Sequence, residues 1–170
     1  KFYGNHVKKF FRPELKEKAT FLDHCLDLRF LDNKPVKKVS LDDPVLIYSK
    51  NRRIDKDYFN FFSNLIDELQ ENDIKYKVIE YGNYKREEYY SMIKNSSCVV
   101  TTSIEDYPGY AMYEAMYLNR PVIGTQYNIP NIFSKDFWVD CQNLDDSWIT
   151  RKDGAAKLYV SKIKNYLNGK

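Results

Sequence analysis

The sequence predicts an α/β fold with a doubly wound parallel sheet flanked by helices. Short apolar runs of strand length alternate with longer stretches in which apolar residues recur at helical spacing. Several of these runs are continuously apolar, which is typical of parallel strands buried on both faces. Alternating strands and helices connect by right-handed crossovers. The pattern is therefore Rossmann-like, and ligands of such sheets bind at the carboxyl ends of the strands.

The elements are expected from residue 44 onward, after a charged loop at 34–43 and a stretch at 15–32 that receives no assignment. The run PVLIYS is a strand buried on both faces, and Tyr58, Phe61 and Leu65 start a helical repeat after it. KYKVIEY is a second strand. Strands are expected at 44–49, 75–81, 98–102, 121–124 and 137–140, and helices at 57–71, 86–95, 109–119 and 155–167.

The composition limits the class of protein. A chain of 170 residues with 43% hydrophobic and 30% charged residues fits one soluble domain with a real core. Its net charge of +3 is spread along the chain, which argues against a nucleic-acid partner. Cys25, Cys98 and Cys141 are too widely spaced for a zinc site and are expected to be reduced, so no metal is predicted. We expect a cytoplasmic protein, with peripheral attachment to an anionic membrane left open.

Residues 103–125, SIEDYPGYAMYEAMYLNRPVIGT, form the most informative segment. Pro108 and Gly109 lie where a helix would begin, and the free N–H groups of a helix start attract an anion. Asp106 and Glu114 supply carboxylates, which accept hydrogen bonds from the neighbouring hydroxyls of a sugar. The segment thus predicts a phosphate-and-sugar site. The alternative is that both acidic residues merely suit a helix.

The same segment resembles the signature of GT-B glycosyltransferases of the group 1 or family 4 type. Asp106 stands where the family usually has Glu, and Glu105 misses that spacing by one residue. The resemblance implies that Asp106 and Glu114 are the catalytic carboxylates. Asp106, with the main chain of Gly109 and Tyr110, would bind the donor sugar, and Glu114 the ribose. The residues in register are Asp106, Gly109, Glu114, Ala115, Met116, Pro121, Val122 and Ile123.

Two further loops match the family less closely. After the first strand, Lys50, Arg52 and Lys56 would bind the diphosphate. The family has Gly-Arg at the start of this loop, and Lys56 stands one position away from the spacing of the family's Lys. After the second strand, Gly82 and Tyr84 would border the base. The alternatives are a solvated basic turn and a helix-capping turn whose Tyr joins the core.

Residues 1–15 are interpreted as an inter-domain connector and residues 16–170 as the nucleotide-sugar-binding domain. Asn5, Val7, Phe11 and Pro13 match the hinge through which the family enters its second domain. The resemblance therefore implies an N-terminal acceptor-binding domain before Lys1, without which the domain would be inactive. One departure is that a single strand, KYKVIEYG, spans an interval where the family has an extra strand and helix.

The resemblance implies transfer of a hexose from a nucleoside-diphosphate sugar to a glycan or lipid acceptor, with retention of configuration, in polysaccharide biosynthesis. No cofactor is expected. Two alternatives stay open: a nucleotide-sugar 2-epimerase-like domain, and a non-catalytic module that binds a nucleotide or a protein.

Overall fold

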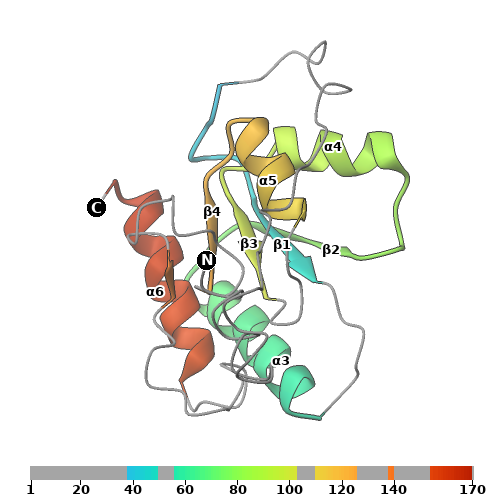
Figure 1. Cartoon of the computed structure of the whole chain (residues 1–170). Helices are drawn as coiled ribbons and strands as arrows, with labels where there is room; N and C mark the ends of the chain where they lie inside the picture. Colours follow the sequence, from blue (N-terminus) through green and yellow to red (C-terminus); the bar gives the residue numbers. More distant parts are fainter. Residues whose placement is uncertain (1–37, 50–55, 103–109, 126–137, 140–153, 170) are drawn as a thin grey trace, which may run out of the picture.

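The structure, a computed structural model, describes residues 38–49, 56–102, 110–125, 138–139 and 154–169 (Figure 1). Its strands form an all-parallel sheet in the order β2-β1-β3-β4, which the short β5 extends beside β4. The elements are β1 (Val45–Ser49), α3 (Lys56–Glu71), β2 (Tyr76–Glu80), α4 (Arg86–Lys94), β3 (Val99–Thr101), α5 (Tyr110–Tyr117), β4 (Val122–Thr125), β5 (Trp138–Val139) and α6 (Ala155–Leu167).

Strand β1 lies in the interior of the sheet, and all five of its residues are buried. It pairs with β2 from Val45 opposite Tyr76, and with β3 through Tyr48 opposite Thr101. Because parallel strands in register end together, the carboxyl ends of β1 and β3 lie side by side at one edge of the sheet. That edge is where the sequence predicts ligand binding.

Helices cover both faces of the sheet (Figure 1). Val45 and Ile47 of β1 pack toward α3 and α6, in one core that also holds Leu65 and Tyr159. The alternate residues of β1 pack toward α4 and α5 in a second core. This alternation follows from the two-residue period of a strand, and it explains why β1 is apolar throughout.

Strand β2 forms an edge of the described sheet, and only Ile79 of its five residues is buried. Val78 is 37% exposed, and Lys77 and Glu80 are exposed as well. Charged side chains on an edge strand discourage pairing with another chain. Within the described sheet no strand lies beyond β2.

The prediction of an α/β fold with a Rossmann-like parallel sheet is confirmed. Each expected strand and helix from residue 44 onward is present, with bounds within two residues of those predicted, and α6 coincides with its prediction. The proposed connector at 1–15 lies outside the described residues, so the division into connector and domain stays a prediction.

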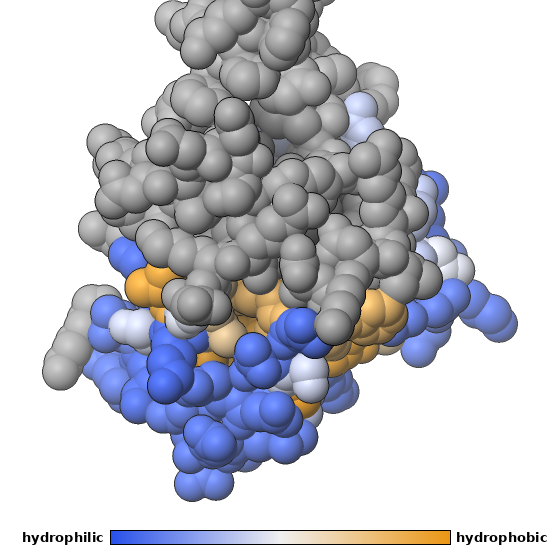
Figure 2. Space-filling view, turned by 90° about the horizontal axis from the view of Figure 1, so that it is seen from below, coloured by the Kyte–Doolittle hydropathy of each residue, from blue (hydrophilic) through white to orange (hydrophobic). Residues whose placement is uncertain are grey.

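Hydrophilic side chains cover much of the described surface on one face of the protein (Figure 2). Figure 2 shows the face seen from below, where an interrupted band of hydrophobic surface crosses hydrophilic side chains. None of the described helices is long and apolar enough to cross a membrane. The large hydrophobic side chains that are exposed among the described residues are Leu41, Phe59, Val78, Tyr81, Tyr110, Tyr117 and Leu158.

The packing of α3 on the sheet gives a test of the fold. Leu65 is fully buried, so Leu65→Ala should lower the free energy of unfolding by about 2–5 kcal/mol, measured by urea denaturation. Leu158→Ala, at a helix position that is 40% exposed, is the matched control and should change it by only about 0.5 kcal/mol. Equal losses in the two variants would contradict the burial of α3.

Candidate functional site

The order of the strands indicates a candidate position for a ligand site. The chain passes from β1 to β2 on one side of β1 and then returns to β3 on its other side. The order of the strands therefore changes direction at β1. In open α/β sheets, ligands bind in the crevice at the carboxyl ends of the strands where this reversal occurs.

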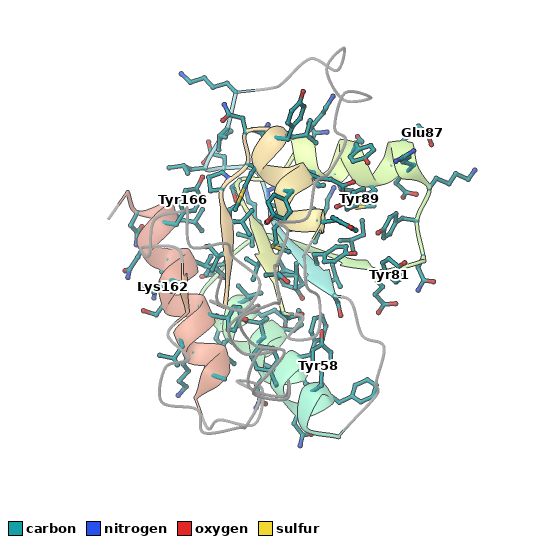
Figure 3. All side chains as sticks on the ribbon, in the orientation of Figure 1. Tyr58, Tyr81, Glu87, Tyr89, Lys162 and Tyr166 are labelled. Atoms are coloured by element: carbon teal, nitrogen blue, oxygen red, sulfur yellow. The ribbon has the colours of Figure 1, made fainter. Side chains whose placement is uncertain are left out.

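A trio of hydroxyls joins the ends of β1 and β3. The Tyr58 hydroxyl of α3 lies 2.7 Å from Ser49 Oγ and 2.8 Å from Thr102 Oγ1 (Tyr58 is labelled in Figure 3). Ser49 and Thr102 are buried. Three hydroxyl protons serve two hydrogen bonds here, so one of the three protons is not used within the trio. Burial raises the pKa of Tyr58, and its hydrogen bonds to Ser49 and Thr102 offset part of that rise.

Thr101 adds a second polar group at the end of β3. Its side chain is fully buried, and Oγ1 has no hydrogen-bond partner among the described residues. Its carbonyl oxygen accepts a hydrogen bond of 3.1 Å from the Tyr159 hydroxyl of α6. The carboxyl end of β3 is therefore polar although it lies inside the protein.

Glu114 is held between α4 and α5 by two tyrosines. The Tyr89 hydroxyl donates to Oε2 at 2.7 Å, and the Tyr90 hydroxyl donates to Oε1 at 2.9 Å. Each carboxylate oxygen thus accepts one hydrogen bond from a different residue. Both helices begin at the carboxyl edge of the sheet, and Glu114 stays half-buried on α5.

Aromatic rings connect this carboxylate to the loop after β2. Tyr84 stacks on Tyr89 with ring centroids 4.8 Å apart and an interplanar angle of 18°. Tyr48, at the end of β1, lies 6.2 Å from the same ring. Figure 3 shows Tyr89 near α5 and Tyr81 beside the end of β2. Tyr84 and Glu114, which come from separate segments of the sequence, therefore both contact Tyr89.

The charges around the tyrosines favour donation to Glu114. Arg86, at the start of α4, lies 6.0 Å from the centroid of the Tyr90 ring, and its hydrogen bond with Tyr90 raises the pKa of Arg86. Desolvation raises the pKa of Tyr90 to about 12 and raises that of Tyr89 as well. Both hydroxyls therefore keep their protons at neutral pH and can donate them to the carboxylate.

The structure describes part of the predicted site. It brings Glu114 and Tyr84 together, and Tyr110 is the exposed first residue of α5. Gly82 has φ of +90°, a conformation that favours glycine, and open space surrounds it. Lys56 is the first residue of α3. The predicted Lys50, Arg52, Asp106 and Gly109 lie outside the described residues, and their roles stay predictions.

Sequence reasoning missed Tyr58, Tyr89 and Tyr90. Tyr58 belongs to the helical repeat expected after the first strand, and no motif singles out Tyr89 or Tyr90. The residue type was itself a signal, because a tyrosine at an apolar helix position buries a hydroxyl that needs a hydrogen-bond partner. The identity of that partner depends on the packing of elements that are distant in the sequence.

Other polar features lie at the opposite edge of the sheet. Arg120 is buried and donates to the carbonyl oxygens of Lys94, at 2.6 Å, and Asn119, at 3.1 Å. A cation beside these carbonyls suits the negative end of a helix, so Arg120 ties the ends of α4 and α5 together. A cavity of about 280 Å³ also lies at this edge, between Asp43, Lys75 and neighbouring residues.

Comparisons with known proteins assign no family to the chain. Protein-family models, curated proteins and solved structures were compared with the chain, and none of them matches. Within the described residues, no three His, Cys, Asp or Glu side chains gather as a metal site would require.

The hydroxyl trio gives a test of how the ends of β1 and β3 are joined. Tyr58→Phe removes the shared hydroxyl from two buried partners and should lower the free energy of unfolding by about 1–3 kcal/mol in urea denaturation. Tyr76→Phe is the matched control, because its hydroxyl only accepts an exposed hydrogen bond from Gln70, and it should cost about 0.5 kcal/mol or less. A Tyr58→Phe variant as stable as this control would contradict the trio.

Tyr90, one of the two α4 tyrosines that bind Glu114, gives a pH test. Its folded-state pKa of about 12 exceeds the ordinary value of 10, so above pH 10 the unfolded chain loses this proton before the native one does. Stability from Tyr90 is therefore complete below pH 10 and is lost as the pH rises toward 12. Urea denaturation at pH 8, 10 and 11 should show a smaller alkaline loss in Tyr90→Phe. An unchanged pH dependence would contradict the assignment.

Proposed function

We propose that the chain is the donor-binding, C-terminal domain of a GT-B glycosyltransferase, with a doubly wound sheet. One observation carries the proposal: Glu114 and Tyr84, predicted to hold the ribose and to border the base, both contact Tyr89 near the carboxyl edge of the sheet. A nucleoside needs both of these contacts within one short distance. Separate surroundings for the two residues would have removed the main support for a nucleotide site.

The chemistry of Glu114 suits the two ribose hydroxyls. An ionised carboxylate accepts about four hydrogen bonds through its two oxygens. Tyr89 and Tyr90 use one position on each oxygen, which leaves one further position on each for a sugar diol. Tyr84, stacked on Tyr89 and half-buried, offers an aromatic surface beside this carboxylate. Base stacking on such a ring tolerates different bases, so the proposal names no base.

The diphosphate and the donor sugar would lie toward the ends of β1 and β3. There the trio of Ser49, Tyr58 and Thr102 offers hydroxyl hydrogen bonds. The sequence adds cations at Lys50 and Arg52, which directly follow Ser49 along the chain. In a transferase, negative charge grows on the diphosphate as the sugar leaves, so fixed cations stabilise the transition state more than the ground state. Asp106 would then contact the sugar.

The reaction would transfer a hexose, with retention of configuration, to a glycan or lipid acceptor in polysaccharide biosynthesis. An acceptor-binding domain of the same protein would supply the other side of the cleft, on the cytoplasmic side of a membrane. No cofactor is needed, because the cations and a helix start can stabilise the leaving group.

A non-catalytic interaction module is the second candidate. Tyr81, Tyr110 and Tyr117 are 53%, 45% and 43% exposed, and exposed tyrosines are common at protein interfaces. An interaction module requires no affinity for nucleotides, whereas a donor-binding domain does.

Calorimetric titration with uridine and guanosine diphosphates and their hexose conjugates tests the proposal. Glu114→Gln keeps the shape of the side chain and removes its charge, so it should weaken binding by roughly tenfold or more. Glu87→Gln makes the same change at an exposed position in the first turn of α4 and should bind as the wild type does (Glu87 is labelled in Figure 3). A folded wild-type chain that binds none of these ligands would contradict the proposal and favour the interaction module.

A further inference from the structure

We propose that Tyr89 and Tyr90 are positioning residues that fix the Glu114 carboxylate to accept a vicinal diol, and so make the site selective for ribonucleotides. This inference rests on the proposed function and adds to it. It assigns two residues that no sequence motif singled out, and it narrows the ligand to nucleotides that carry both the 2′ and the 3′ hydroxyl.

The geometry of the carboxylate carries the first step. A Glu side chain rotates about several bonds, and an unrestrained carboxylate would present its lone pairs in many directions. Here Tyr89 binds Oε2 at 2.7 Å while Tyr90 binds Oε1 at 2.9 Å. Two donors on different oxygens fix both the position and the plane of the group. A ligand that meets a carboxylate already fixed does not bear the entropy cost of ordering it.

The surroundings of the tyrosines carry the second step. Tyr89 and Tyr90 belong to the core between α4, α5 and the sheet, and they are 4% and 7% exposed. Their rings are therefore held by packing, and their hydroxyls cannot follow a carboxylate that moves. Arg86, 6.0 Å from the centroid of the Tyr90 ring, adds a cation–π contact on that ring.

The stacking contact carries the third step. Tyr84 stacks on Tyr89 at 4.8 Å, so the residue that borders the base and the residue that fixes Glu114 touch each other. The distance between the base and ribose contacts is thereby set within the protein before any ligand binds. A nucleotide that lacks one hydroxyl would leave one prepared acceptor position empty, and that loss distinguishes deoxynucleotides from ribonucleotides.

The test compares a ribonucleoside diphosphate with its 2′-deoxy and 3′-deoxy analogues by calorimetry. The wild type should prefer the ribonucleotide by roughly tenfold or more, since each lost hydrogen bond leaves a charged acceptor unpaired. Tyr89→Phe and Tyr90→Phe each keep the ring and remove one donor. Each should reduce ribonucleotide affinity about two- to tenfold and change deoxynucleotide affinity less, so the preference shrinks. Tyr117→Phe, an exposed site on α5, is the matched control and should keep the preference.

The outcomes separate this inference from the proposed function. If the wild type binds no nucleotide, both fall together. If it binds, and Glu114→Gln abolishes the preference while both Phe variants keep it, the inference alone is overturned. Equal losses for all three nucleotides in the Phe variants would also overturn it, since a purely structural link between α4 and α5 predicts that result. If one variant does not fold, the other carries the test. Loss of cooperative unfolding in both would assign a structural role and overturn the inference.

Discussion

The burial of β1 on both faces is the constraint on which the rest of the structure depends. A strand paired on both sides, with every residue buried, requires a layer of helices above it and another below it. That requirement places α3 and α6 on one face and α4 and α5 on the other. It also directs the first turns of α3 and α4 toward the carboxyl edge of the sheet, where their tyrosines meet the strand ends.

Tyr58 and Tyr89 each combine two functions in one side chain. The ring packs in the core, and the hydroxyl satisfies a polar group that the core would otherwise leave buried. Tyr58 does this for Ser49 and Thr102 on one face of the sheet, and Tyr89 does it for Glu114 on the other. The described ends of β1 and β3 thus stay polar while hydrogen bonds hold their side chains in place.

Much of the fold could be predicted from the sequence, because local pattern determines local structure. The continuous apolar run of β1 and the helical spacing in α3 and α6 gave bounds close to those observed. Edge strand β2 shows where such reasoning stops. Its residues have strand propensity, but its place at the edge of the sheet depends on which strands pair with it, and no short-range pattern records that choice.

The sequence by itself determined the alternation of strands and helices, because that follows from spacing within short segments. It also offered Glu114 and Tyr84 as candidates, through the resemblance of two short segments to a family signature. Only the tertiary structure decided that Tyr89 would join these two residues and that Tyr58 would bridge β1 and β3. The physical reason is that a side-chain hydrogen bond depends on distance in space. Packing of the helices on the two faces of the sheet brings these side chains within hydrogen-bond distance, and no periodicity along the chain encodes that arrangement.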